Sequence, residues 1–171
     1  MNSETKEIFC LDANVFIFMH RFYPMQHIPD LWTLLADLFH EHKIISHRYV
    51  YDEIIPFQDG LSQWLVNFKP YFLPISLRQT ELVKDVLKNF PKLINHNYEK
   101  NQADPWLIAL LLELMENDGM FGDHSKYVLV TNENSSSTIK LPAACRFYNI
   151  RHMDLWQFFT TNGFRFSVSR S

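Results

Sequence analysis

The sequence predicts an α/β fold in which a central parallel sheet is flanked by helices in three α/β/α layers. Short, fully apolar runs such as Ile8–Leu11 and Tyr127–Val130 are typical of strands that are buried on both faces. Between such runs lie segments with apolar residues at helical spacing, for example residues 29–42. Strands that alternate with helices indicate parallel pairing, because each helix returns the chain across the sheet.

Composition indicates one globular domain. The chain has 171 residues, of which 47% are apolar and 20% charged, and we expect the domain to span residues 1–160 with a tail at 161–171. The N-terminus is polar and acidic, without the pattern of a secretion signal, and no apolar run approaches the roughly 18 residues of a membrane span. We therefore expect a cytoplasmic protein with no membrane partner.

The first part of the chain carries clear start and stop signals. Pro29 suits the first turn of a helix and Ser46 suits an N-cap. Pro70 and Pro74 bracket a segment that can form only a short or edge strand, and Pro91 ends the helix before it. The predicted elements are a strand at 8–11, a helix at 14–19, a loop at 20–24, a helix at 29–42, a strand at 43–45, helices at 46–57 and 61–68, an edge strand at 71–73 and a helix at 77–89.

The second part continues the alternation. A polar loop at 93–102 precedes Asp104-Pro105, a strong helix start because Asp suits the N-cap and proline suits the first helical position. The helix that follows is apolar almost all round and is predicted to be buried. The remaining predicted elements are a strand at 127–130, a loop at 134–137, a helical turn around Ala144, a strand at 147–150 and a helix at 155–159.

Four acids lie at element ends or on inward faces of this predicted fold. Asp12 and Glu133 follow buried strands, where ligands bind in open α/β sheets. Asp104 opens a buried helix, and Glu53 lies on the helix that follows the second strand. Each acid alone has a structural explanation, since Asp12 and Asp104 can both serve as helix caps. Their joint placement favours a functional site.

Glu53 is hard to explain as a surface residue. At about 100° per residue it falls about 60° from Val50, at the edge of an apolar stripe. Asp52 falls on the opposite face, where Arg48 can pair with it one turn away. An acid at the edge of a buried face needs a partner, a proton or a metal. The stripe is formed by Val50, Ile54, Phe57 and Leu61.

Four segments resemble, in order, the motifs of PIN-domain nucleases, and most of all the bacterial toxin-like branch related to VapC-type ribonuclease toxins. The resemblance covers residues 6–160 and implies a parallel sheet flanked by helices and metal-dependent cleavage of RNA. It implies Asp12, Glu53, Asp104 and Glu133 as catalytic and metal-binding acids, with Asn14 and Thr131 in support. The fourth acid departs from the pattern, in which Asp is common. The segments are Leu11-Asp12-Ala13-Asn14, residues 46–54, residues 104–109 and Val130-Thr131-Asn132-Glu133.

The chemistry of four carboxylates agrees with that resemblance. Carboxylates about 5 Å apart repel by roughly 3 kcal/mol per pair at an effective dielectric constant of about 20. Mg²⁺ or Mn²⁺ would relieve that repulsion, since both prefer oxygen ligands, and a pair of such ions can activate water and stabilise the leaving oxygen. The net charge of −3 indicates that any RNA contact is local. Arg21 and Arg48 are candidates for binding phosphates, as are Lys69, Lys140 and Arg151, although each can equally be a solvated surface charge.

The expected function is therefore hydrolysis of phosphodiester bonds in single-stranded or structured RNA by the toxin of a toxin–antitoxin pair. The resemblance implies a protein antitoxin as partner, and we also expect a homodimer. Two alternatives stay open: a non-catalytic PIN-like binding module, and another metal-dependent phosphoesterase. A phosphatase with an aspartyl nucleophile is disfavoured because Asn14 stands where its second acid belongs.

Overall fold

Five parallel strands form one sheet, which confirms the predicted α/β class. The computed structural model describes residues 6–97 and 102–167. Its strand order is β3-β2-β1-β4-β5, and each neighbouring pair is parallel. The strands are β1 (Ile8–Leu11), β2 (Ile44–His47), β3 (Phe72–Leu73), β4 (Tyr127–Val130) and β5 (Arg151–Met153).

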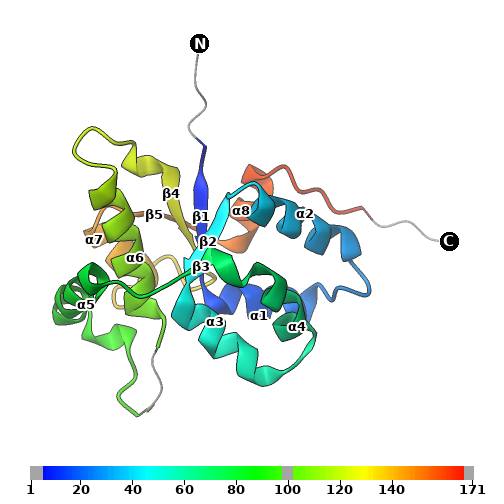
Figure 1. Cartoon of the computed structure of the whole chain (residues 1–171), viewed down its shortest axis with the longest axis horizontal. Coiled ribbons are helices and arrows are strands. Elements are labelled where there is room, and N and C mark those ends of the chain that lie inside the picture. Colours follow the sequence, from blue (N-terminus) through cyan, green and yellow to red (C-terminus); the bar gives the residue numbers. More distant parts are fainter. Residues whose placement is uncertain (1–5, 98–101, 168–171) are drawn as a thin grey trace.

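Helices cover both faces of the sheet. Helices α5, α6 and α7 lie on one side and α1, α2, α4 and α8 on the other (Figure 1). The described residues form α1 (Ala13–Phe22), α2 (Pro29–His40), α3 (Arg48–Ile54), α4 (Gly60–Leu65), α5 (Leu77–Asn89), α6 (Asp104–Asn117), α7 (Leu141–Phe147) and α8 (Leu155–Thr161), with 3₁₀ turns at Ile55–Phe57, Val66–Tyr71, Pro91–Leu93 and His124–Lys126. None of these helices is long and apolar enough to cross a membrane.

The order of the strands determines where a site can form. From β1 the chain moves outward through β2 and β3, whereas β4 and β5 lie on the other side of β1. Connections therefore diverge between β1 and β4, and ligands in open α/β sheets bind at such a switch point, beyond the carboxyl ends of the strands. Leu11 pairs with Val130 at the end of these two strands. Asp12 follows β1 directly and Thr131 follows β4 directly, so both leave the sheet at that point.

The junction of β2 and α3 differs from the prediction. Ser46 is not the N-cap of α3 but a buried residue of β2, and its hydroxyl donates to the carbonyl of Leu11 at 2.6 Å. The N-cap is His47, whose ring accepts from the backbone N–H of Tyr49. The strand begins at Ile44 and ends at His47, later in the chain than the predicted 43–45. Lys43 precedes the strand because its backbone N–H donates to the carbonyl of Leu38 in α2.

Three other predicted elements are wrong. Helix α1 continues to Phe22 through the segment predicted as a loop at 20–24. Phe57, predicted in the apolar stripe, is 66% exposed, because the helix changes to a 3₁₀ turn and Gln58 then adopts φ 52°. The predicted strand at 147–150 is the end of α7, where Asn149 at φ 55° closes the helix and Ile150 donates to the carbonyl of Cys145. The strand itself is β5, which begins at Arg151, directly after the predicted segment.

Most other predicted bounds agree with the structure. Helix α5 and strand β4 have the predicted limits, and β3 is the short edge strand expected between Pro70 and Pro74. Helix α6 begins at Asp104, one residue before the predicted first helical position at Pro105, and ends at Asn117. The predicted loop at 93–102 lies in part outside the described residues, as do the last four residues of the predicted tail.

Candidate active site

The four predicted acids come from four separate segments and lie at the carboxyl edge of the sheet. Asp12 follows β1, Glu53 lies on α3, Asp104 is the first residue of α6 and Glu133 follows β4. They are close enough to act on each other electrostatically, since Glu133 and Glu53 each raise the pKa of Asp12, and Asp12, Glu133 and Glu53 each raise that of Asp104. The structure thus brings together residues that are up to 121 positions apart in the chain.

Asp12 does not act as a helix cap. It occupies the N-cap position of α1, but its side chain makes no capping hydrogen bond. Instead, the hydroxyl of Thr131 donates to Oδ2 of Asp12 at 3.0 Å. The residue is only 3% exposed, and burial, followed by the charges of Glu133 and Glu53, raises its pKa to about 7 although the Thr131 bond lowers it.

Asn14 and Thr131 connect the ends of β1 and β4. The amide of Asn14 donates to the hydroxyl oxygen of Thr131 at 3.3 Å, and its carbonyl oxygen accepts from the backbone N–H of Asn132 at 3.1 Å. The same Thr131 oxygen accepts from the backbone N–H of Glu133 at 3.3 Å. These bonds orient the Thr131 hydroxyl toward Asp12 and hold the segment that carries Glu133.

Glu53 is tied to the start of α6. Its Oε1 accepts from the backbone N–H of Ala103 at 2.8 Å. That N–H immediately precedes Asp104, so the bond brings α3 to the N-terminal end of α6. Burial raises the pKa of Glu53 even though the bond from Ala103 lowers it. Helical spacing placed Glu53 at the edge of the apolar face of α3. From that edge its carboxylate reaches the start of α6.

Asp104 also lacks the capping role that its sequence context suggested. It lies inside the first turn of α6, Ala103 is the N-cap, and no side chain caps this helix. Among the described residues, none forms a hydrogen bond with the Asp104 carboxylate. Burial and then the charges of Asp12, Glu133 and Glu53 raise its pKa to about 8, while Lys140 lowers it. The charge of this carboxylate is therefore costly in the folded protein, and its local structural contribution is limited to the interaction of an acid with the first turn of a helix.

Glu133 contacts the start of α7. Its Oε2 accepts from the backbone N–H of Leu141 at 2.8 Å, and Nζ of Lys140 lies 4.0 Å from Oε1. The Glu133 side chain is 19% exposed. Lys140, one of the weaker phosphate-binding candidates, is thus the cation beside this end of the acid cluster.

The residues fit a hard divalent cation in chemistry rather than in a preassembled geometry. All four donors are carboxylates, which Mg²⁺ and Mn²⁺ favour. Two of them, Glu53 and Glu133, are held by backbone N–H groups, and Asp12 is held by a hydroxyl. Within the described residues, no three His, Cys, Asp or Glu side chains already converge on one metal position. Binding of an ion would therefore require the carboxylates to move closer together, which their mutual repulsion opposes until the ion is present.

The two predicted substrate-binding arginines lie on the surface. Arg48 pairs with Asp52 at 2.9 Å, as the helical spacing predicted. Arg21 is exposed in the last turn of α1, with its guanidinium 5.4 Å from the ring centre of Phe22. Both helices begin at the edge that carries the acids, so Arg48, the first residue of α3, lies near that edge, whereas Arg21 lies at the other end of α1.

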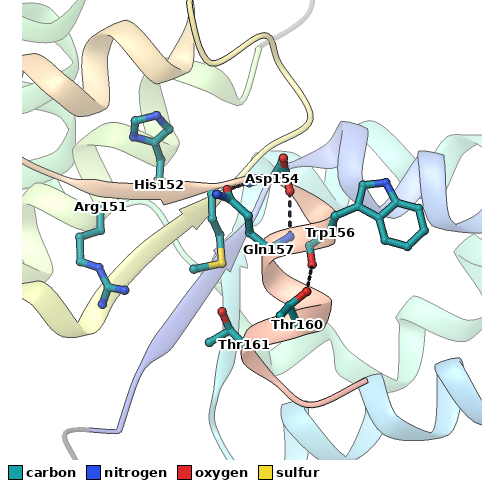
Figure 2. A pocket seen from close by; sticks show the side chains of 8 residues that line it. Arg151, His152, Asp154, Trp156, Gln157, Thr160 and Thr161 are labelled. Carbon is teal, nitrogen blue, oxygen red and sulfur yellow. Dashed lines mark hydrogen bonds between the residues drawn. The ribbon is translucent and has the colours of Figure 1, made fainter. Parts of the chain in front are cut away.

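A separate hollow lies beside β5, the edge strand at the other side of the sheet from β3. It has a volume of about 490 Å³, and none of the four acids lines it. Figure 2 shows its walls, with Arg151 and His152 on β5 and Asp154, Trp156 and Gln157 around the start of α8. Arg151 is held by Glu7 and by the carbonyl of Ser125, each at 2.7 Å. It begins β5, so it lies at the amino end of the parallel strands and not at the edge that carries the acids.

Two contacts at the site have no signal in the sequence. The backbone N–H groups of Ala103 and Leu141 bind the carboxylates of Glu53 and Glu133, and a backbone donor is the same for every residue type except proline. His47 was also missed, because Ser46 beside it is a better N-cap by residue type. These features depend on how distant segments meet.

Residues 9–166 match the family described as "Domain of unknown function (DUF4411)". The match includes all four acids together with Asn14 and Thr131. A comparison of the sequence with curated proteins finds no match.

Proposed function

The chain belongs to the DUF4411 family, and we propose that its four neighbouring acids form the centre of a Mg²⁺- or Mn²⁺-dependent ribonuclease. The observation that carries this proposal is the state of Asp12 and Asp104. Asp12 is buried and Asp104 half-buried, both have raised pKa values, and neither caps the helix that it begins. The described residues supply one nearby cation, Lys140, at the edge of the group. Such carboxylates are explained by a cation that is bound during function.

Within this proposal the residues divide the work. Asp12 and Asp104, the two whose pKa values are raised furthest by burial and by the other acids, are the direct ligands, and Glu53 and Glu133 complete the coordination. The cations supply charge stabilisation and an activated water when they are bound. Thr131 holds Oδ2 of Asp12 in one orientation, and Asn14 in turn holds Thr131. Because the pKa values of Asp12 and Asp104 are raised, their protons must be released on metal binding, so affinity increases with pH.

RNA is the proposed substrate on two grounds. The first is the resemblance of the four acid-bearing segments to PIN-domain nucleases. The second is chemical, since divalent ions held by carboxylates stabilise the charge that develops in phosphodiester hydrolysis. Lys140 lies next to Glu133, and Arg48 and Arg21 extend the positive charge along α3 and α1.

The direct test is cleavage of mixed single-stranded and structured RNA by the purified protein with Mg²⁺, with Mn²⁺ and with a chelator. We expect cleavage with either metal and none with the chelator. Asp52→Asn is a matched control, because this acid is next to Glu53 in sequence but lies on the exposed face, paired with Arg48. The control variant should cleave as the wild type does. Cleavage that persists in chelator would contradict the metal mechanism, and failure to cut RNA with any metal would favour a binding module.

A toxin role is a further part of the proposal and is supported by the resemblance alone. Expression of the protein without its antitoxin should inhibit growth, and Asp12→Asn should relieve the inhibition. Colony counts after induction of each variant measure this effect. Equal inhibition by the wild type and Asp12→Asn, at equal protein levels, would separate toxicity from the acid cluster.

A further inference from the structure

A row of buried and half-buried polar side chains, which contains none of the four acids, runs from the start of α3 to α6. The backbone N–H of Tyr49 donates to Nδ1 of His47 at 3.0 Å, and Nε2 of His47 lies 3.1 Å from Oε1 of Gln79. Nε2 of Gln79 donates to Oε2 of Glu113 at 2.6 Å. The hydroxyl of Ser76 donates to the other oxygen of Glu113 at 2.6 Å. His47 is fully buried and Gln79 is 2% exposed.

These bonds determine the protonation of the histidine. Because Nδ1 accepts a hydrogen bond, the ring proton must be on Nε2, from which it is donated to Gln79. The Gln79 amide then has one orientation, with its oxygen toward His47 and its nitrogen toward Glu113. Burial lowers the pKa of His47 to about 4, so the ring is neutral near pH 7, as an accepting Nδ1 requires.

The row connects the two helices that carry proposed metal ligands. His47 caps α3, which carries Glu53, and Glu113 lies on α6, which begins with Asp104. The ring of His47 also stacks on Trp106 of α6, with ring centres 5.5 Å apart and an angle of 28° between the planes. Trp106 is two residues beyond Asp104, so the histidine contacts α6 within its first turn.

A second connection joins the same helices at the site itself, the bond from Ala103 to Glu53. The edge-to-face contact of Tyr49 on α3 with Trp106 on α6 adds to these two connections. Together they define the spacing between Glu53 and Asp104. Without the row, only the ring contact of Tyr49 and the Ala103 bond remain. That bond uses the carboxylate which the metal must also use, so it is the weakest of these constraints when an ion binds.

We propose that His47 is a positioning residue that sets the distance between the Glu53 and Asp104 carboxylates, through neutral hydrogen bonds to α5 and α6 and the stack on Trp106. This inference rests on the proposed function, since it assigns His47 a role in metal binding. A merely structural role would affect stability alone. If His47 has a positioning role, its removal lowers the affinity for the metal. Part of the binding energy must then be used to bring Glu53 and Asp104 into place.

Four single variants separate the two roles. His47→Asn retains a good N-cap for α3 but is too short to reach Gln79. Gln79→Met keeps the cap and the approximate volume and breaks the connection to Glu113. Glu113→Gln retains an oxygen that can accept a hydrogen bond from Gln79, so it is the conservative control that keeps the connection to α6. Val86→Ala leaves the row intact and removes packing at a fully buried position of α5, and it serves as the destabilised control.

The measurements are the Mn²⁺ dissociation constant by calorimetric titration, the melting temperature in chelator, and the dependence of RNA cleavage on Mn²⁺ concentration. We expect His47→Asn and Gln79→Met to weaken Mn²⁺ binding by about tenfold, the lower end of the effect of residues that orient metal ligands. Cleavage by both should return toward the wild-type rate at saturating Mn²⁺. Glu113→Gln should bind Mn²⁺ nearly as the wild type does, and Val86→Ala should melt earlier with unchanged affinity.

The outcomes distinguish the inference from the function on which it rests. If the wild type binds Mn²⁺ and the His47 and Gln79 variants bind it equally well while melting earlier, the row is structural and the inference is wrong. If Val86→Ala weakens binding as much as they do, affinity follows stability and the inference is also wrong. If the wild type neither binds Mn²⁺ nor cleaves RNA, the proposed function fails and the inference fails with it.

Discussion

Two polar regions of this protein both involve α3 and α6, and they are built on opposite principles. In the row from His47 to Glu113, each side chain donates to or accepts from the next, and the histidine is neutral. In the acid cluster, Asp104 receives no hydrogen bond from the described residues, and its pKa is raised by burial and by three neighbouring acids. The first region is complete within the protein, whereas the second needs protons or a cation.

The difference shows how a buried polar group can be assigned to structure or to function. Buried polar groups that satisfy one another contribute to stability and to a unique arrangement. Buried like charges destabilise the fold and are retained when binding requires them. Asp12 and Asp104 both occupy helix starts, where a carboxylate could have served as a cap, and neither does so. Their position at a helix start is therefore explained by the metal proposal and not by capping.

The largest expected difference between the two regions is in catalysis. Asp12→Asn should lower the rate of RNA cleavage by about a thousandfold, because charge stabilisation by bound metal is worth several kcal/mol and each 1.4 kcal/mol is about tenfold. His47→Asn should lose activity only at low Mn²⁺. Single-turnover cleavage at limiting and saturating Mn²⁺ measures both. If Asp12→Asn were fully active at saturating Mn²⁺, Asp12 would behave like His47, and the distinction between a metal ligand and a positioning residue would be lost.

The pH dependence of stability should separate the regions next. The pKa values of Asp12 and Asp104 are raised in the folded protein, from 3.8 to about 7 and about 8, so between these limits the folded state binds more protons than the unfolded state. In chelator the free energy of unfolding should therefore decrease from about pH 4 to about pH 8 and then level off. Replacing both residues with Asn should flatten this slope.

Urea denaturation of the metal-free protein from about pH 5 to about pH 9 measures that slope. Gln79→Met is the control, since it disrupts the neutral row and leaves both acids in place, and it should lower stability at every pH without changing the slope. A wild-type slope of zero or of opposite sign would mean that the acids are not held at raised pKa.

The sequence could predict the acids but not the groups that hold them. Asp12 and Glu133 follow buried apolar strands, and Glu53 was placed by helical spacing, so burial patterns alone located three of the four. The capping interpretation of Asp104 was wrong, because Ala103 precedes it in helical conformation and takes the N-cap position. The partners of Glu53 and Glu133 are backbone N–H groups 50 and 8 residues away, and residue type carries no information about them.

The errors in the fold have a similar origin. Tyr148 and Ile150 are as typical of strands as the residues of β5 itself, and Asn149 decides between the two by adopting φ 55°. Phe57 has the spacing of the apolar stripe but follows Pro56, which lacks the N–H needed to continue the helix. In both cases a local backbone conformation overrode a correct reading of apolar periodicity.

A smaller effect on cleavage is expected from a change at Thr131, which connects Asp12 of the acid cluster to Asn14 through hydrogen bonds. Thr131→Val removes the donor to Asp12, and a hydrogen bond to a charged group contributes about 1.5–3 kcal/mol, equivalent to one or two pKa units. The pH at which cleavage reaches half its maximum should rise by about one unit, with recovery at high pH. A rate that falls equally at every pH would show that Thr131 supports the fold rather than the charge of Asp12.

The smallest effect is expected at Arg48. Its pair with Asp52 is exposed at both ends, so Arg48→Gln should change stability by less than about 0.5 kcal/mol. If Arg48 binds a phosphate, the salt dependence of binding to single-stranded RNA should become shallower by about 0.7 in the logarithmic slope. Fluorescence anisotropy over a salt series measures this with Ca²⁺ in place of Mg²⁺. An unchanged slope would assign Arg48 to the surface pair alone.

The central claim is that the acid cluster is held for a divalent cation at the expense of stability, and Asp104→Asn tests it most directly. Thermal melts of the wild type and the variant are compared in chelator and in Mn²⁺ at about pH 9, above the raised pKa values of both Asp12 and Asp104, where both bear most of their charge. Glu116→Gln is the control, since this acid lies at the other end of α6 and is paired with Arg78.

We expect Asp104→Asn to be more stable than the wild type in chelator by about 1–2 kcal/mol, or roughly 2–8 °C. The relieved repulsion should outweigh the lost interaction of the charge with the helix dipole, about 0.3–1 kcal/mol, and no capping bond is lost. Mn²⁺ should then raise the melting temperature of the wild type and of Glu116→Gln, and raise that of Asp104→Asn much less. Equal or lower stability of Asp104→Asn in chelator, with a full response to Mn²⁺, would contradict the claim.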